Sequence, residues 1–349
     1  MAILPTRSLP GTGQELTVLG LGCAPLGGLF EPVSEDVARG TVQAAWDRGV
    51  RFFDTAPFYG YGLSEHRLGH ALRERPREQW HVSSKAGRLL IPRVRGARPA
   101  TPRPPGDAWA EPLPFEPRFD YSAAGLRRSV EDSLQRLGLN WLDILLVHDI
   151  GELTHGAAHG GHWQALTGGG FAELQAMREE GLVGAVGLGV NEWQVAMQAL
   201  EHVRLDCCLL AGRYTLLEQG ALRPFLETCQ ARRIAVIIGG PFNSGVLAGP
   251  DVARAHFDYQ TVPPAVSRKV LALRAVCEPH AVPLGAAALQ FPLAHPAVIS
   301  CLPGARSPEE LKQVIDWYHW PVPPALWSDL KRQRLLEAQA PVPGERDAD

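Results

Sequence analysis

Short, almost continuous apolar runs alternate along this chain with longer stretches of helical periodicity. The runs at residues 144–147 and 234–238 contain no polar side chain at all. Such runs are typical of strands that are buried on both faces of a parallel sheet. Because strand and helix patterns repeat in turn, the sequence predicts an α/β fold built on parallel strands.

Eight such strands can be placed in the sequence. They are expected at residues 16–21, 51–54, 80–85, 142–148, 183–190, 205–211, 234–239 and 298–302. Eight strands suit a closed (β/α)8 TIM barrel, which needs about 250 residues plus insertions. A doubly wound sheet would show the same local pattern, so the strand count favours the barrel only slightly. We expect one barrel domain over residues 1–349, ending in a helix and tail at 324–349.

The helices between these strands have recognisable ends. Ser34 is a predicted N-cap of a helix that Gly49 ends, and Ser122 caps one that Gly138 ends. A third helix is predicted at residues 171–180.

Two long segments interrupt the alternation. Residues 90–118 are rich in proline and arginine, and residues 150–170 are rich in glycine and histidine. Both are expected to be irregular loops. In a barrel the loops that follow the carboxyl ends of the strands shape the active site, and both segments follow a strand. We therefore expect them to form walls of the site.

Composition excludes several classes of partner and location. The formal net charge is −3, so nothing favours binding to nucleic acid or to an anionic membrane. Residues 1–22 lack a secretory signal pattern, and no apolar stretch is long enough to span a bilayer. Six cysteines in so long a chain do not resemble a disulfide framework. The sequence therefore predicts a cytoplasmic protein with reduced thiols in its core.

Three successive predicted strands end in reactive side chains. These are Asp54, Lys85 and His148, and Tyr59 follows in the loop after the first of them. Taken singly, each has an ordinary interpretation, such as a turn former, a solvated strand end, a core histidine or a surface aromatic. In a barrel, however, these strand ends lie side by side at one rim.

Together the four side chains make an acid–base unit. A tyrosine has a pKa of about 10 in water, so it is a poor acid and base at neutral pH. The Lys85 ammonium would lower the pKa of Tyr59, and the Asp54 carboxylate would hold that ammonium in place. His148 would orient a substrate oxygen. This arrangement suits proton transfer at an oxygen whose carbon exchanges hydride.

At this point the sequence resembles the aldo-keto reductases. The motifs that carry the resemblance lie at residues 53–60, 83–85, 145–148, 186–189 and 302–307, within a match that spans nearly the whole chain. The resemblance implies a (β/α)8 barrel with a catalytic tetrad of Asp54, Tyr59, Lys85 and His148. It also implies NAD(P) bound at the rim without a Rossmann fingerprint.

The sequence departs from the common family pattern where the nicotinamide would be held. Many members have Ser-Asn where this chain has Gly189 and Val190, a Gln where it has Ala211, and an aromatic residue where it has Gly239. Asn191 is the expected replacement for the carboxamide contact. The same departures resemble the aldose 1-dehydrogenase branch, which includes L-fucose (D-threo-aldose) dehydrogenases and pyridoxal 4-dehydrogenase.

Further coenzyme contacts are expected at three places on the rim. The turn at residues 240–245 would approach the pyrophosphate, although a plain glycine turn explains it equally well. A helix capped by Ser307 would face a phosphate, and the end of the first strand is also expected to contact the coenzyme. The candidates there are Gly22, Cys23, Gly240, Phe242, Ser244, Gly304, Arg306 and Glu310. Arg306 could pair with a 2′-phosphate, but Glu309 and Glu310 favour NAD over NADP.

The resemblance implies oxidation of a cyclic hemiacetal, such as the aldose L-fucose, to its lactone. Phe58, Trp109 and Tyr214 are expected to line the substrate pocket. The alternatives are pyridoxal oxidation, a general NADPH-dependent reductase and a regulatory subunit that binds coenzyme. The expected partner is a small molecule, and the sequence does not indicate an oligomeric state.

A metal-dependent hydrolase is a further alternative. It would use His148 and Asp149 together with His155, His159 and His162. Because the last three lie among glycines rather than on a rigid element, we expect no metal site.

Overall fold

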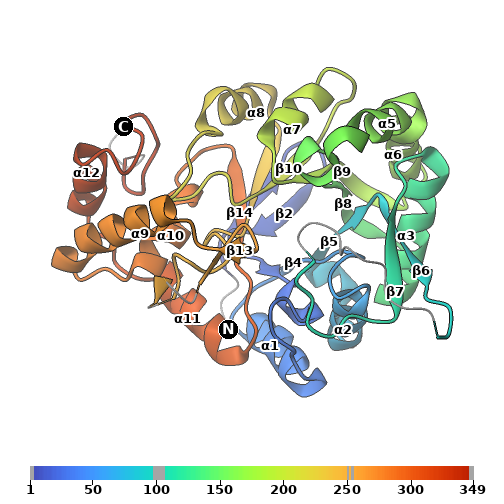
Figure 1. Cartoon of the computed structure of the whole chain (residues 1–349), viewed down its shortest axis with the longest axis horizontal. Coiled ribbons are helices and arrows are strands. Elements are labelled where there is room, and N and C mark those ends of the chain that lie inside the picture. Colours follow the sequence, from blue (N-terminus) through green and yellow to red (C-terminus); the bar gives the residue numbers. More distant parts are fainter. Residues whose placement is uncertain (1–3, 97–106, 250, 253–254, 346–349) are drawn as a thin grey trace.

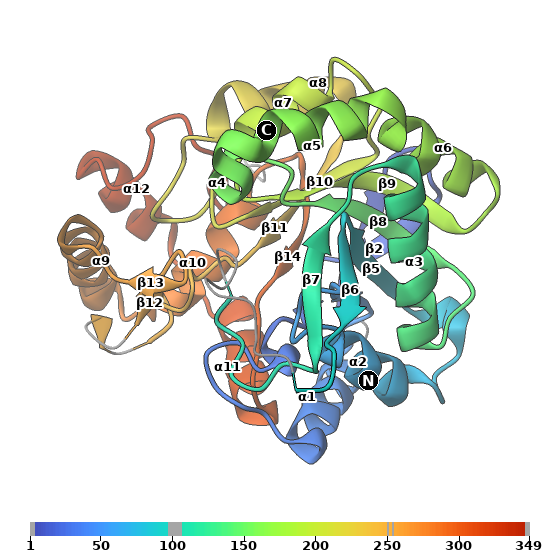
Figure 2. The ribbon, with the colours of Figure 1, turned by 45° about the vertical axis from the view of Figure 1, so that its right-hand side comes forward.

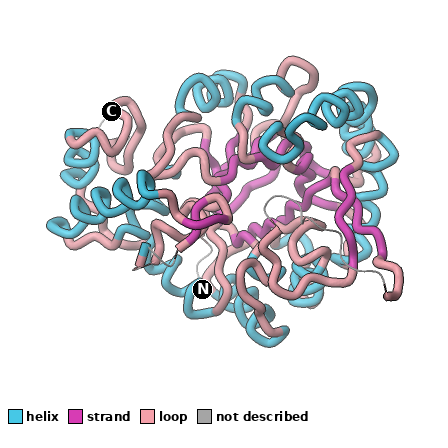
Figure 3. Tube along the Cα trace, in the orientation of Figure 1, coloured by secondary structure: helices cyan, strands magenta, loops and turns pink. Residues whose placement is uncertain are grey.

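Eight parallel strands form the centre of the molecule. The computed structural model describes residues 4–96, 107–249, 251–252 and 255–345 (Figure 1). The strands follow the order β14-β11-β10-β9-β8-β5-β4-β3, and every neighbouring pair is parallel. Bridges from Leu19 to Cys301 and from Gly22 to Gly304 bring the two edges of the sheet together. The predicted (β/α)8 TIM barrel is confirmed, and Figure 3 shows the strands enclosed by helices.

The strands lie close to the positions that the apolar runs predicted. The barrel strands are β3 (Leu21–Gly22), β4 (Phe52–Asp54), β5 (His81–Ala86), β8 (Leu142–His148), β9 (Val183–Val190), β10 (Cys207–Ala211), β11 (Ala235–Gly239) and β14 (Val298–Leu302). The prediction of one strand at residues 16–21 is wrong. That apolar run is shared between β3 and an N-terminal hairpin.

The N-terminal hairpin covers one end of the barrel. Its strands are β1 (Thr6–Leu9) and β2 (Gln14–Thr17), paired antiparallel. Leu9 and Leu16 are fully buried in one cluster with the side chains that fill the barrel interior, among them Phe52 and Ile237. The hairpin side chains complete this inner core, which explains why the run from residue 16 is so apolar.

Helices surround the strands. They are α1 (Glu35–Asp47), α2 (Leu63–Leu72), α3 (Ala123–Leu137), α4 (Glu152–His155), α5 (His159–Ala165), α6 (Phe171–Glu179), α7 (Trp193–Ala199), α8 (Glu227–Arg232), α9 (Pro264–Cys277), α10 (Leu284–Leu293), α11 (Pro308–Tyr318) and α12 (Pro324–Arg332). Ser34, Ser122 and Ser307 cap α1, α3 and α11 by accepting backbone N–H bonds, as predicted. Gly138 ends α3 in a left-handed conformation.

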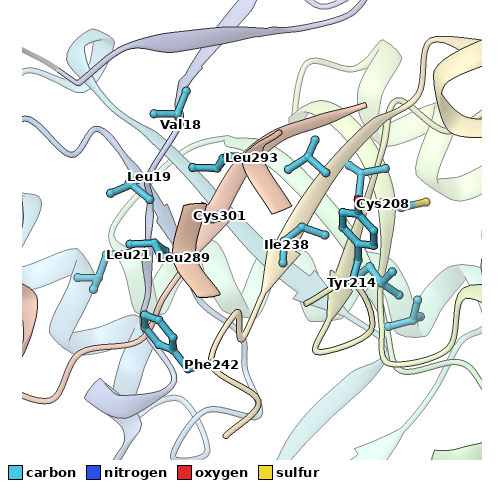
Figure 4. Packing of buried hydrophobic residues seen from close by; sticks show 14 of the residues in the cluster. Val18, Leu19, Leu21, Cys208, Tyr214, Ile238, Phe242, Leu289, Leu293 and Cys301 are labelled. Atoms are coloured by element: carbon cyan, nitrogen blue, oxygen red, sulfur yellow. The ribbon is translucent and has the colours of Figure 1, made fainter. Parts of the chain in front are cut away.

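A second, larger core fills the layer between the strands and the helices. Figure 4 shows part of it, with Leu289 of α10 beside Leu19 and Cys301 of the sheet. All six cysteines are buried and free of disulfides. Among the described residues, no helix is long and apolar enough to cross a membrane.

The two interrupting segments are more regular than the sequence predicted. Strands β6 (Arg88–Pro92) and β7 (Phe115–Phe119) form an antiparallel hairpin beside α3 (Figure 2), while residues 97–106 of the first segment lie outside the described residues. The second segment contains α4, α5 and a π turn at Leu166–Gly170. Its histidines His155 and His162 pack on the aromatic rings of Phe119 and Tyr121. These tertiary contacts offset the low helix propensity of glycine.

A third hairpin follows β11. Its short strands are β12 (His256–Phe257) and β13 (Gln260–Thr261), joined by Asp258 and Tyr259. Both turn residues have positive φ, 48° and 63°. The ring of Phe30, in the loop after β3, stacks on His256 at 4.1 Å between centroids. Two segments that are distant in the sequence thus meet at the rim.

Candidate active site

Neighbouring strands bring three of the predicted side chains to one rim. Asp54 is the last residue of β4, Lys85 lies one residue before the end of β5, and His148 is the last residue of β8. In the sheet β4 pairs with β5 and β5 pairs with β8, all parallel. Their carboxyl ends therefore point the same way, as the sequence predicted.

Lys85 joins two members of this group directly. Its Nζ donates to Asp54 Oδ2 at 2.7 Å, to the carbonyl oxygen of Thr55 at 2.9 Å and to Tyr59 Oη at 3.0 Å. The other Asp54 oxygen accepts from Ser83 Oγ at 2.7 Å. Since only 2% of the Lys85 side chain is exposed, it is not a solvated strand end. The ammonium is held at the Tyr59 oxygen.

The turn that presents Tyr59 depends on a close backbone approach. Gly60 has a φ of +63°, and a Cβ at this position would lie 2.4 Å from the carbonyl oxygen of Gly27. A Cβ at Gly27 would in turn lie 2.6 Å from the Tyr59 backbone. Only glycine fits at either position, so this pair of glycines fixes where the Tyr59 side chain begins.

The protonation state of Tyr59 differs from the sequence-based expectation. Burial raises the pKa of the Tyr59 phenol well above its usual value, and the charges of Asp54 and Asp149 add to this, while Arg88 opposes it. The net shift of the Tyr59 pKa is therefore opposite in direction to the lowering expected from Lys85. Tyr59 is a neutral phenol, and Lys85 lies where it stabilises the phenolate once that forms.

His148 faces Tyr59 across the site. The ring centroids are 6.1 Å apart and the rings are nearly perpendicular. Burial lowers the pKa of His148 well below its usual value, and the positive charges of Arg88 and Lys85 act in the same direction. A neutral imidazole can donate a hydrogen bond to a substrate oxygen without first gaining a proton. Its Nδ1 has no hydrogen-bond partner among the described residues.

Tyr59, Lys85 and His148 border a cavity of about 320 Å³. The other residues that line it are Ala24, Leu29, Phe58, Trp109, Asp149, Leu153, Thr154, Gly189, Val190, Asn191, Leu209, Ala211, Arg213, Asp258, Tyr259 and Gln260. Asp54 is not among the lining residues, because it lies behind Lys85. Two of the three residues predicted to contact substrate, Phe58 and Trp109, are part of the wall.

The prediction for Tyr214 is wrong. This side chain is fully buried and does not line the cavity. Its ring packs on Phe291, with 5.2 Å between centroids, and on His295 at 5.7 Å. Tyr214 lies three residues beyond the end of β10, and the chain there turns its ring into the outer core.

Sequence reasoning missed a wall that comes from the hairpin β12–β13. Tyr259 and Asp258 of its turn line the cavity, and Arg213 holds them there. The two terminal nitrogens of Arg213 donate to the two carboxylate oxygens of Asp258, both at 2.9 Å, while Nε donates to the carbonyl oxygen of Asn191 at 3.1 Å. Nothing local in the sequence connects residues 213 and 258, so no motif could have indicated this contact.

The expected coenzyme contacts fall into two groups. Asn191 lines the cavity beside Gly189 and Ala211. A Cβ at Gly189 would lie 3.3 Å from Lys85 Cε, so glycine keeps this side of the cavity open. The space is bordered by small residues and by the Asn191 amide, and it fits a flat amide-bearing ring such as nicotinamide.

The second group lies outside the cavity. Gly22 and Gly304 form the bridge that helps to close the barrel, and Cys23 is buried beside them. Gly240, Phe242 and Ser244 are in the turn after β11, where the Phe242 ring packs on Trp317 at 5.5 Å. The Phe242 ring therefore belongs to the core. The backbone N–H groups of Gly22 and Cys23 already donate to the carbonyl oxygens of Pro303 and Asp54. The positions of this group remain predictions as coenzyme contacts.

Arg306 is neutralised by two carboxylates. Its guanidinium nitrogens lie 2.7 Å from Glu310 and 3.0 Å from Glu31.

The histidines that suggested a metal-dependent hydrolase make other contacts. His155 Nε2 lies 2.9 Å from Tyr121 Oη, and the His155 ring packs on that of His162 at 4.3 Å between centroids. Among the described residues, no group of three or more potential ligands is placed to hold a metal ion.

Comparison with known proteins agrees with this geometry. A sequence profile of the Aldo/keto reductase family matches residues 18–333. The chain belongs to the aldo/keto reductase family. It is 48% identical over 334 residues to a pyridoxal 4-dehydrogenase from Microbacterium luteolum, covering 95% of this chain and 97% of the relative. It is 36% identical over 325 residues to a D-threo-aldose 1-dehydrogenase from a Pseudomonas species, covering 93% and 96%.

Solved structures of the family share the barrel. A glycerol dehydrogenase from Gluconobacter oxydans superimposes with a TM-score of 0.73 at 24% identity, covering 97% of each chain. The holo form of an aldo-keto reductase from Bacillus halodurans gives a TM-score of 0.71 at 21% identity, covering 96% of this chain and 97% of the other. At these identities the likeness concerns the fold alone.

Proposed function

We propose that this aldo/keto reductase oxidises a cyclic hemiacetal to its lactone. The observation that carries the proposal is the contact of Lys85 with both Asp54 and Tyr59, opposite His148 at the bottom of a cavity. A nicotinamide coenzyme, when bound, supplies the acceptor for the hydride that leaves the anomeric carbon. The four side chains handle the proton on the neighbouring oxygen.

Each side chain has a separate role in that proton transfer. Tyr59 Oη, as the phenolate, accepts the proton of the anomeric hydroxyl, and in the reverse direction the phenol returns it to the carbonyl oxygen. The Lys85 ammonium, 3.0 Å away, stabilises the phenolate charge. Asp54 fixes Lys85 through the 2.7 Å ion pair. His148, as a neutral imidazole, hydrogen-bonds the same substrate oxygen and orients it.

Two substrates follow from the two relatives. Pyridoxal, whose aldehyde closes to a hemiacetal with its hydroxymethyl group, comes first because of the 48% identity over 95% of the chain. The aromatic rings of Phe58, Trp109 and Tyr259 along the cavity suit a flat ring. An aldose such as L-fucose is the second candidate. It is supported by the 36% identity to the aldose dehydrogenase and by the carboxylates of Asp149 and Asp258 in the wall.

We propose NAD as the preferred coenzyme, with Asn191 holding the carboxamide. Arg306 is the cation that could receive the 2′-phosphate of NADP, but Glu31 and Glu310 already neutralise it. A phosphate placed there would meet two like charges. A ribose hydroxyl, in contrast, could donate to Glu310.

The test is a substrate survey with NAD and with NADP, followed through the near-ultraviolet absorbance of the reduced coenzyme. The substrates are pyridoxal, L-fucose, D-arabinose and simple aldehydes. We expect NAD-linked oxidation of at least one hemiacetal. Turnover of simple aldehydes with NADPH alone would instead indicate a general reductase. Coenzyme binding without turnover of any substrate would favour a regulatory subunit.

A further inference from the structure

A buried ion pair lies beside the tetrad. Its charges shift the pKa values of Tyr59 and His148, but neither of its side chains carries the proton in the transfer described above. Arg88 is the first residue of β6, and Asp149 follows directly after β8. Arg88 Nη2 donates to Asp149 Oδ2 at 2.6 Å. The side chains are 2% and 15% exposed, and Asp149 lines the cavity. Removing two charges from water is costly, so this pair calls for an explanation.

Two aromatic rings flank the Arg88 guanidinium beside Asp149. The guanidinium lies 3.8 Å from the centroid of the Phe58 ring and 5.0 Å from that of Phe119. Its Nε and Nη1 have no hydrogen-bond partner among the described residues. Burial raises the pKa of Asp149, while Arg88 and Lys85 oppose that rise. The cation therefore helps to keep a buried carboxylate charged at the cavity surface.

The backbone fixes Asp149 next to the reacting groups. Its φ is +45°, a left-handed conformation that Asp and Asn adopt more readily than most residues. Tyr121 Oη donates to the preceding carbonyl oxygen, that of His148, at 2.7 Å. Asp149 Oδ2 lies 3.4 Å from His148 Nε2. The carboxylate therefore borders the side of the site where His148 meets a substrate oxygen.

This placement suggests a partner for the carboxylate. If the reacting oxygen lies between Tyr59 and His148, a hydroxyl on the adjacent carbon comes close to the flank of His148. We propose that Asp149, held by Arg88, accepts a hydrogen bond from the substrate hydroxyl on the carbon next to the one that carries the reacting group. In an aldose this is the 2-hydroxyl. In pyridoxal the corresponding group is the ring hydroxyl, which lies one carbon further from the reacting carbon. The inference rests on the proposed function and names the feature of the substrate that the site recognises.

The consequence is selectivity against analogues that lack this hydroxyl. A site built to pair with a hydroxyl rejects a substrate without it, because the buried acceptor is then desolvated and left without a donor. The substrate that lacks the hydroxyl should therefore lose kcat/KM in the natural enzyme. That penalty should shrink when the charge of the acceptor is removed.

The test compares matched substrates in two variants. Asp149→Asn removes the charge and suits the left-handed backbone. The substrate pairs are D-arabinose with 2-deoxy-D-ribose, and pyridoxal with 3-deoxypyridoxal. We expect the ratio of kcat/KM within a pair, hydroxylated over deoxy, to fall about tenfold in Asp149→Asn. Asp258→Asn, which changes another carboxylate of the same cavity, serves as the control and should leave the ratio within about twofold.

Two results would overturn the proposal. Equal losses for both members of a pair would mean that Asp149 acts only by positioning His148. No loss for either member would mean that Asp149 does not contact the substrate. If Asp149→Asn fails to fold, Arg88→Lys keeps the positive charge but removes the planar group over Phe58, and it should lower the same ratio by a smaller factor.

The test remains informative if the natural enzyme oxidises no hemiacetal, which would refute the proposed function by itself. Lactaldehyde and propanal, in the reductive direction, then form the matched pair. Saturation-transfer difference NMR of either pair on the complex with NADH measures the same selectivity without turnover. Loss of selectivity in Asp149→Asn would still support the contact, and equal binding of both ligands to the natural protein would refute it.

Discussion

The tetrad and the walls of the same cavity are built in different ways. Asp54, Lys85 and His148 lie at the ends of adjacent strands, and their places follow from the barrel itself. The walls come from inserted segments, such as the hairpin whose turn carries Tyr259, and they are held by side-chain contacts such as Arg213 with Asp258. On the proposed function, the strand ends would supply the chemistry, whereas the inserted segments would decide which molecule receives it.

If the strand ends carry the chemistry, Tyr59→Phe should have the largest effect. The variant loses the group that moves the proton, and kcat should fall by about 10²- to 10⁴-fold. Binding of NADH, measured by fluorescence titration, should stay within about twofold. Tyr61→Phe is the matched control, since Tyr61 donates to Asp107 instead of contacting Lys85. A Tyr59→Phe enzyme with full turnover would contradict the assignment.

The protonation of Tyr59 predicts opposite pH dependences in the two directions. Because burial, Asp54 and Asp149 raise its pKa, the phenol is protonated at neutral pH and the phenolate fraction grows as pH rises. Oxidation needs the phenolate, so its kcat should increase with pH by up to about tenfold per unit. Reduction needs the phenol and should not increase. Steady-state rates between neutral and alkaline pH check this, and a falling oxidation rate would contradict it.

A change in the wall should act on substrate binding more than on chemistry. Asp258→Asn removes the bidentate ion pair with Arg213 that fixes the turn beside Tyr259. Half of the Asp258 side chain is exposed, so we expect only a several-fold rise in KM, with kcat within about twofold. Asp316→Asn, which breaks an exposed ion pair with Lys312 on α11, is the control. A large fall in kcat with unchanged KM would mean that the wall affects the chemical step as the tetrad does, which would contradict the comparison.

The smallest expected effect concerns the coenzyme. Glu31→Gln removes one of the two carboxylates that neutralise Arg306, and Glu31 is largely exposed. The ratio of kcat/KM for NADP to that for NAD should rise a few-fold. Separate titrations with the two coenzymes measure it. A fall in this NADP-to-NAD ratio would show that Arg306 does not contact the 2′-phosphate of NADP.

The sequence predicted the strand ends well because their signals are local. Three successive predicted strands end in a reactive residue, and parallel pairing brings these ends to one rim without further information. Asp149 was visible beside His148, but nothing in the sequence linked it to Arg88, which pairs with it across 61 positions. The direction of the Tyr59 pKa shift could not be read from the motif for a related reason: burial and the charges of Asp54 and Asp149 raise this pKa, and they depend on the folded structure.

Other differences have the same origin. The apolar run at residues 16–21 reflects burial but not strand membership, because the hairpin and the barrel share one core. Residues 150–170 are largely helical because aromatic contacts stabilise them, as between His155 and Phe119. Tyr214 follows a barrel strand as a wall residue would, yet its ring enters the outer core. Tertiary packing decides each of these cases, and periodicity does not report it.

The central claim is that the tetrad oxidises a hemiacetal, and the first product tests it most directly. The protein would be mixed with NAD and pyridoxal, or with D-arabinose, and the product formed in early turnovers identified by mass spectrometry. The account predicts the lactone, two hydrogens lighter than the substrate, formed in step with NADH and absent with Tyr59→Phe. Direct appearance of the carboxylic acid, or an undiminished yield with Tyr59→Phe, would contradict it.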